Sequence, residues 1–233
     1  MQLILASASP ARRATLSSAQ IRHEVRVSSV DEEALVAAEQ RRVGALTAQQ
    51  HVQLLAAAKA RAVAQQVIAE GNPTAAAAVV GCDSMFSLGG AVVGKPHTAQ
   101  VARERLRKMS GHAGTLFTGH CVIDLRDAPH DQCGDSLNGG NLRDSGLRDG
   151  SLREANGISQ ATVFIGELSE AEIEAYIASG EPLEVAGSFT VDGRGGPFVE
   201  RIEGDYHGVV GISLPLLREL LGELGFAVTD FWQ

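Results

Sequence analysis

The sequence has few cysteines, no long apolar run and no excess of positive charge, and each absence excludes a class of protein. Only three cysteines occur in 233 residues, far apart and without C-x-x-C spacing, so neither a disulfide framework nor a zinc knuckle is indicated. No apolar run approaches the roughly 18 residues that span a bilayer, and no basic segment followed by an apolar stretch opens the chain. We therefore expect a cytoplasmic protein with no membrane association.

The net charge of −8 argues against a surface that binds nucleic acid, because binding to a phosphate backbone depends on clustered lysine and arginine. A small anionic ligand is still permitted, since it needs only a few cations in one place. The seven histidines lack the spacing of metal ligands, and the phosphate-loop, nucleophile-elbow and dinucleotide-binding motifs are absent. The common templates for nucleotide binding and hydrolysis are therefore excluded.

Apolar strands alternate with capped helices along the chain, which predicts an α/β fold, and 233 residues can form one large domain or two closely joined small ones. Residues 2–6 form the first predicted strand, and Ser9 and Pro10 begin the first helix as its cap and first residue. The longest predicted helix runs from Thr47 to about Glu70, with Thr47 and Gln50 at capping-box spacing. Further elements are predicted as a strand (76–82), a hairpin (85–93), a helix (98–108), two strands (115–125 and 161–165), a helix (169–178), a strand (198–202) and a helix (215–221).

Residues 127–159 break this alternation. The segment is rich in Gly, Asp, Asn, Ser and Arg, and the fragments at 142–144, 147–149 and 152–154 repeat one another every five residues. Such repetition is typical of a low-complexity insertion that packs little. We predict a mobile surface loop between two strands, for which partner binding is the less favoured role.

The first candidate for chemistry is the strand-to-helix junction that contains Ser9, Arg12 and Arg13. A helix N-terminus presents free N–H groups and partial positive charge, so it attracts phosphate. Two arginines in the first turn oppose the helix dipole, and a bound anion would resolve that conflict. A capped helix with solvated arginines explains the same residues equally well.

The second candidate is Lys59, which lies in the apolar stripe of its predicted helix. A lysine in this position extends its ammonium group to solvent, which is the commoner outcome, or meets a negative partner. The run Asp31-Glu32-Glu33 lies on a predicted loop and offers carboxylates to a hard cation, although it is equally typical of a solvated acidic turn.

The third candidate joins Asp83 and Ser84 with Lys95, which follows the predicted hairpin. Ligands of open α/β sheets lie beyond the carboxyl ends of strands, where we place Asp83, and the hairpin would return Lys95 to the same end. An acid beside a lysine also fits a simple ion pair. Its position next to a phosphate-type junction favours a site.

Together these segments resemble the Maf family of nucleotide pyrophosphatases, in order along nearly the whole chain outside the insertion. The opening Leu3-Ile-Leu-Ala-Ser-Ala-Ser-Pro10 with two arginines is similar to the signature loop of that family. The match continues through Asp31-Glu32, Ala58-Lys59-Ala60, Gly81-Cys82-Asp83-Ser84, Gly94-Lys95-Pro96, Ser110-Gly111, Thr118-Gly119, residues 176–183, Ala186-Gly187, residues 198–206 and residues 209–211.

The resemblance implies a single domain with an elongated α/β fold. The fold has a mixed, strongly twisted sheet with flanking helices, and two lobes surround a deep cleft. It implies that water attacks the α-phosphorus of a nucleoside triphosphate with the help of Mg²⁺ or Mn²⁺, which releases pyrophosphate. Asp83 would be the base that activates water, with Lys95 beside it, and Glu32 and Asp83 would place the metal. Phosphate oxygens would be held by Ser9, Arg12, Arg13, Lys59 and Lys95. A homodimer is expected from the family alone.

Three positions depart from the family pattern at the residues that read the base. Ala11 stands where relatives specific for dTTP and UTP have Arg and those acting on 7-methyl-GTP have Trp. Ser84 replaces the usual Thr and Asp192 the usual Gln. The resemblance therefore implies the reaction class, but it does not imply which nucleobase the substrate has. The competing hypotheses are a nucleotide-binding regulator of septum formation and a phosphatase or sugar-nucleotide hydrolase that uses the same cleft.

Overall fold

The computed structural model describes residues 1–71, 76–126 and 152–233, and it confirms the predicted α/β class. The described strands form one mixed, open sheet in the order β2-β1-β3-β5-β6-β7, and β4 pairs with β3 off this path. β1 is parallel to β2 and β3, and the remaining pairings are antiparallel. The strands are β1 (Gln2–Leu5), β2 (His23–Val25), β3 (Ala76–Leu88), β4 (Ala91–Val93), β5 (Ala113–Asp124), β6 (Glu154–Ile165) and β7 (Val199–Gly204).

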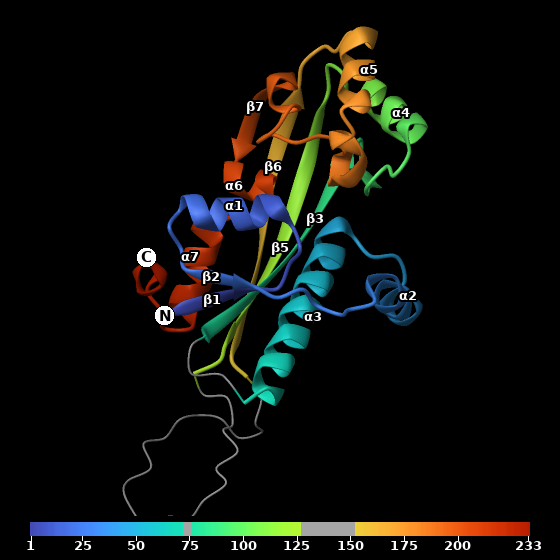
Figure 1. The fold of residues 1–233 in the computed structure, drawn as a ribbon. Helices are drawn as coiled ribbons and strands as arrows, with labels where there is room; N and C mark the ends of the chain where they lie inside the picture. The colour runs from blue at the N-terminus through green and yellow to red at the C-terminus, as the bar shows by residue number, and fades with distance from the viewer. Residues whose placement is uncertain (72–75, 127–151) are drawn as a thin grey trace, which may run out of the picture.

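Helices flank this sheet along its length. The long strands β3, β5 and β6 run through an elongated molecule, with α4 and α5 near one end and α1, α3 and α7 nearer the other (Figure 1). No helix in the described residues is long and apolar enough to cross a membrane. The helices are α1 (Pro10–Ser18), α2 (Glu32–Val43), α3 (Ala48–Ala69), α4 (Ala99–Met109), α5 (Glu170–Ala178), α6 (Tyr206–Val210) and α7 (Leu214–Glu223), with 3-10 helices η1 (Glu181–Glu184), η2 (Ala186–Ser188), η3 (Gly196–Phe198) and η4 (Val228–Phe231).

The helix starts follow from local hydrogen bonds that the sequence predicts. Ser9 caps α1 by accepting from the Arg12 N–H, and Pro10 occupies the first turn. The capping box of Thr47 and Gln50 is present at the start of α3, and a second capping box begins α5. These predictions are confirmed. Each hydrogen bond joins residues only three positions apart, so residue type and spacing are enough to predict it.

Helix α3 lies directly against β3 and β5 because both strands carry a glycine beneath it. A Cβ atom on Gly81 would lie 2.2 Å from the Ala56 carbonyl oxygen, and one on Gly119 would lie 2.5 Å from the Val52 carbonyl oxygen. The helix supplies small side chains at this contact, among them Ala56 and Ala60, and both are fully buried. The close approach holds α3 at a fixed height above β3, and this positions Lys59 over the strand.

Apolar side chains cover both faces of the central strands. One cluster joins β1 and β3 to α7 and includes Leu5, Val80 and Leu217. The other packs α3 on the opposite face and includes Ile4 and Val63. Because side chains alternate along a strand, neighbouring residues of β3 face these two environments in turn.

Three boundaries differ from the sequence prediction. β3 continues to Leu88, so Asp83 lies inside a strand and the prediction of a strand end there is wrong. Asp31-Glu32-Glu33 is not a loop, because Asp31 caps α2 and Glu32 is its first residue. β6 begins at Glu154, so the last six residues of the predicted insertion are strand, and residues 127–151 lie outside the described residues.

Candidate active site

Lys59 is the centre of a charged cluster on the α3 face of β3. Its Nζ donates to Asp83 Oδ1 at 2.8 Å and forms an ion pair with Glu32 Oε1 at 2.9 Å. The Lys59 and Asp83 side chains are only 11% and 14% exposed, whereas Glu32 is 48% exposed. Two outcomes were predicted for Lys59, extension to solvent or a negative partner. The structure shows the second, with Asp83 and Glu32 as two negative partners.

The cluster keeps unused hydrogen-bonding capacity. An ammonium group has three N–H donors, so the hydrogen bond to Asp83 and the ion pair with Glu32 leave at least one donor of Lys59 without a partner among the described residues. Asp83 uses Oδ1 for Lys59, and its Oδ2 has no hydrogen-bond partner among the described residues. One donor and one strong acceptor therefore remain for a ligand or for water.

The donor set of the cluster suits a hard divalent cation. Glu32 and Asp83 offer carboxylate oxygens, which Mg²⁺ and Mn²⁺ prefer. Nowhere in the described ranges do three or more His, Cys, Asp or Glu side chains converge to hold a metal. Mg²⁺ typically uses one or two carboxylates and completes its shell with water and phosphate oxygens. Two carboxylates at this position therefore fit a metal that arrives with a phosphorylated substrate.

Arg12 lies on the other face of β3. Its guanidinium group also binds a backbone carbonyl of β3 that no neighbouring strand in the described part of the chain reaches. β1 ends at Leu5, and after the bond from the Ala6 N–H to the Val80 carbonyl no further strand residue pairs there. Arg12 Nη1 donates to the Cys82 carbonyl of β3, two residues beyond Val80, at 2.9 Å. The same guanidinium donates to the Gly211 carbonyl at 2.7 Å, and to the hydroxyls of Ser7 and Ser84 at 3.0 Å each.

A relay of hydroxyl groups extends this network into the sheet. Ser84 Oγ accepts from Arg12 and lies 2.9 Å from Thr118 Oγ1, which itself donates to the Gly208 carbonyl at 2.8 Å. Because the single proton of Thr118 is used for Gly208, Ser84 must donate to Thr118. Both hydroxyl protons are thus engaged within the protein.

The two arginines that the sequence presents as equivalent have different surroundings. Arg12 is buried and holds four protein acceptors, so it is tied to the fold. Arg13 is exposed and forms no ion pair with any described residue. The Ser9 hydroxyl accepts from the Arg12 N–H as the helix cap, and Ala11 is half-buried. The open cation at this helix start is therefore Arg13.

Lys95 and Asp192 are exposed and have no ion-pair partner in the described part of the chain. The simple ion pair between Lys95 and Asp83, which was the alternative to a site, is not found among the described residues, where Asp83 pairs with Lys59. The turn that carries Lys95 is held by the Arg105 guanidinium on the Gly94 carbonyl and follows β4, which pairs with the last residues of β3. The structure thus joins Glu32, Lys59 and Asp83, and it joins Arg12 to Ser84.

Sequence reasoning missed several residues that hold the site. Ser7 is buried and accepts from both the Ser9 N–H and Arg12, and its only sequence signal is its place in the same junction. Thr118 belongs to the matched fragment Thr118-Gly119, but no local signal predicts its partners, which come from β3 and α6. Glu181 accepts hydrogen bonds from the loop that carries Asp192. In the sequence, Glu181 only follows a glycine in an ordinary turn, which does not single it out.

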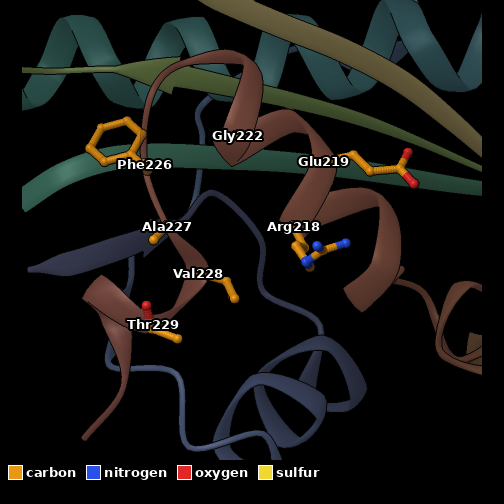
Figure 2. A pocket seen from close by; sticks show the side chains of 7 residues that line it. All are labelled: Arg218, Glu219, Gly222, Phe226, Ala227, Val228 and Thr229. Atoms are coloured by element: carbon orange, nitrogen blue, oxygen red, sulfur yellow. The ribbon is translucent and has the colours of Figure 1, made fainter.

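A pocket of about 480 Å³ lies elsewhere, between α7 and the segment that follows it (Figure 2). None of the candidate site residues lines it. Its walls combine exposed polar side chains with the ring of Phe226, and they are Arg218, Glu219, Gly222, Phe226, Ala227, Val228 and Thr229.

Comparison with known proteins identifies the family of the chain. The chain matches the family of Maf-like proteins over residues 2–224. A "Nucleoside triphosphate pyrophosphatase" of Nocardia farcinica is 47% identical, with 99% of this chain and 96% of the relative covered. A protein of the same name from Saccharopolyspora erythraea is 46% identical, with 100% and 97% covered. Part of a "Nucleoside triphosphate pyrophosphatase/Nudix hydrolase fusion protein" of Bifidobacterium longum is 49% identical over 154 residues, which are 66% of this chain and 27% of the fusion. The chain therefore belongs to the family of Maf-like proteins.

Proposed function

We propose that this protein is a nucleoside triphosphate pyrophosphatase, which hydrolyses its substrate to a nucleoside monophosphate and pyrophosphate. The observation that carries the proposal is the cluster in which Lys59 bridges Asp83 and Glu32, while Asp83 Oδ2 accepts no hydrogen bond from any residue that the structure describes. The names of the full-length relatives support the same reaction.

In the proposed reaction a water oxygen attacks the α-phosphorus, and the bond from that phosphorus to the bridging oxygen breaks. Pyrophosphate leaves with the bridging oxygen, and the water proton passes to Asp83 Oδ2. Lys59 holds the other oxygen of Asp83 at 2.8 Å, which fixes the direction of Oδ2. Since proton transfer requires a base within hydrogen-bond reach, this orientation is the main contribution of Lys59.

Glu32 and Asp83 would hold a divalent cation, Mg²⁺ or Mn²⁺. Such an ion, when bound, neutralises polyphosphate charge and lowers the pKa of bound water. Lys59 lies between the two carboxylates, and its third N–H is left for a phosphate oxygen. The cluster has one cation and two anions, so a dication gives it a net positive charge that suits a triphosphate.

The phosphate chain would be held by the start of α1 and by exposed cations. Arg13 and the free N–H groups of the first turn, capped by Ser9, form one part, and Lys95 forms another. Arg12 has at most one unused N–H, so its main effect on phosphate binding is to hold the α1 junction against β3.

Base selection is proposed to depend on Ala11 and Asp192. Ala11 offers only a methyl group, and the ionised carboxylate of Asp192 accepts but cannot donate hydrogen bonds. Ser84, the third predicted position, has its one donor engaged by Thr118, so it retains only acceptor capacity. We expect strict selectivity for dTTP and UTP to be lost.

A panel of nucleoside triphosphates, assayed for pyrophosphate with Mg²⁺ or Mn²⁺, tests the proposal. Pyrophosphate and a monophosphate should appear together from at least one nucleotide. Nucleotide binding without turnover would favour the regulator, and early release of phosphate would favour a phosphatase. A cytoplasmic location and a homodimer complete the proposal, and sedimentation tests the latter.

A further inference from the structure

The loop of residues 190–196, hereafter the 190s loop, is wrapped around a single carboxylate. Glu181 Oε1 accepts from the Gly195 N–H at 3.1 Å and from the Thr190 hydroxyl, and Oε2 accepts from the Arg194 N–H at 3.1 Å. The Tyr176 hydroxyl donates to Oε1 at 3.2 Å and in turn accepts from the Thr190 N–H at 3.1 Å. Four donors from two segments thus converge on Glu181.

Glycine is required where the loop passes closest to this carboxylate. A Cβ atom on Gly195 would lie 2.5 Å from the Thr190 carbonyl oxygen and 2.6 Å from the Tyr176 hydroxyl, and one on Gly193 would lie 2.9 Å from both Glu181 oxygens. Such distances are shorter than van der Waals contact, so the loop closes around Glu181 only because these positions lack side chains. The loop contains no strand, and its only helical residue is the first of η3.

Glu181 stays ionised within this arrangement. Burial raises the pKa of Glu181, but the hydrogen bonds that it accepts from the loop outweigh burial and hold its pKa below the usual value. A carboxylate that accepts several N–H and O–H bonds is strongly favoured in its charged form. At neutral pH the loop is therefore organised by a full negative charge.

Asp192 lies at the exposed part of the same loop, between Thr190 and the two residues whose N–H groups bind Glu181. Its own side chain has no partner among the described residues. The direction of Asp192 is therefore set by the backbone of the loop, and that backbone is held by Glu181.

We propose that Glu181 is a positioning residue for nucleobase selection, acting through the 190s loop on Asp192. This inference rests on the proposed function, in which Asp192 faces the base. It predicts that loss of the Glu181 carboxylate weakens the preference between bases without changing how the phosphate chain is held.

The test compares Glu181→Gln with Glu184→Gln, a matched change on the same 3-10 helix at an exposed carboxylate. A glutamine amide presents one NH₂ group that cannot accept from an N–H, so at least one loop donor loses its partner whichever way the amide turns. Two quantities are measured for each protein. They are the ratio of kcat/KM for UTP and GTP, and the inhibition constant of inorganic triphosphate, which has no base.

We expect Glu181→Gln to move the UTP to GTP ratio roughly tenfold toward one, the size of a lost polar contact in substrate discrimination. The inhibition constant should stay within about twofold, and Glu184→Gln should change neither quantity. An unchanged ratio, or equal losses for both nucleotides and for inorganic triphosphate, would overturn the proposal. A wild-type protein that shows no base preference would overturn it as well.

A second variant covers the case in which Glu181→Gln does not fold. Tyr176→Phe removes one donor to Glu181 and the acceptor of the Thr190 N–H, but leaves the carboxylate in place. It should shift the ratio in the same direction by a smaller factor. Failure of every protein, wild type included, to release pyrophosphate or to bind inorganic triphosphate would instead contradict the proposed function.

Discussion

The two faces of β3 carry polar clusters that differ in how completely they are satisfied. On one face Arg12, Ser84 and Thr118 bond to one another and to backbone carbonyls, with both hydroxyl protons used. On the other face, Lys59 keeps a donor and Asp83 an acceptor that have no partner in the described part of the chain. A buried group whose bonds are all made within the protein holds structure, whereas unused capacity beside solvent is available for chemistry. The comparison associates the Arg12 face with stability, and the Asp83 face is the one on which we propose that catalysis takes place.

The largest effect is expected at Asp83. Asp83→Asn removes the proposed base and should lower turnover by roughly 10²–10⁴, the usual contribution of a positioned general base. Folding should survive, because Lys59 keeps its ion pair with Glu32. Steady-state kinetics and thermal melting measure the two quantities, and Glu33→Gln is the control at an exposed carboxylate of α2. Near-normal turnover with an unchanged metal requirement would show that Asp83 is not the base.

The two arginines of α1 are expected to have different roles, Arg12 in stability and Arg13 in substrate binding. Arg12→Ala leaves buried carbonyl and hydroxyl acceptors unpaired and should lower the free energy of unfolding by about 3 kcal/mol or more. Arg13→Ala should change it by less than about 0.5 kcal/mol, since Arg13 is exposed, but should raise KM roughly tenfold through loss of a charged contact. Chemical denaturation and kinetics distinguish them. Equal stability of the two variants would show that the hydrogen bonds of Arg12 do not stabilise the fold.

The Arg12 face should also respond to acid through His120. Its Nδ1 donates to the Thr118 carbonyl at 3.0 Å, and its Nε2 accepts from the Ser213 N–H at 2.9 Å. Burial lowers the pKa of His120 from 6.5 to about 4. The unfolded chain therefore binds a proton between these values that the folded protein does not bind. Stability should be unaffected above pH 6.5 and should fall by about 3 kcal/mol as the pH drops toward 4.

The His120 prediction is checked by the slope of unfolding free energy against pH, so a general loss of stability in a variant does not obscure it. His120→Gln should flatten the slope between pH 6.5 and 4. His112→Gln, at an exposed histidine, should leave it unchanged. An unaltered slope in His120→Gln would assign the acid response to other groups.

The smallest effect concerns base preference. Asp192→Gln restores an amide that can both donate and accept, and it should move kcat/KM toward UTP by roughly one to two orders of magnitude relative to GTP. Initial rates for UTP, dTTP, CTP and GTP in both proteins provide the measurement. If the wild type already prefers UTP by a hundredfold, the hypothesis about Asp192 is wrong.

Local features were predictable from the sequence, and long-range contacts were not. The Ser9 cap and the capping box of Thr47 and Gln50 involve neighbouring residues, so residue type and spacing suffice. Helix α2 was missed because it buries no residue and therefore shows no apolar stripe. The length of β3 was underestimated because Asp83 and Ser84 interrupt an apolar run in the middle of the strand.

The candidate residues were predictable as types, but their partners were not. Lys59 and Asp83 are 24 positions apart and meet only because Gly81 and Gly119 admit α3 close to the sheet. Without that packing, Lys95 is the nearer lysine in sequence and the natural choice for Asp83. The contrast between Arg12 and Arg13 likewise depends on where β1 ends.

The most direct test of the catalytic assignment follows the oxygen atom of the attacking water. Hydrolysis in water enriched in a heavy oxygen isotope, analysed by mass spectrometry, should place the label in the nucleoside monophosphate and leave pyrophosphate unlabelled, because attack occurs at the α-phosphorus. Asp83→Asn should lose this product while Glu33→Gln forms it at the wild-type rate. Label in pyrophosphate or in inorganic phosphate released first, or undiminished labelling in Asp83→Asn, would contradict the account.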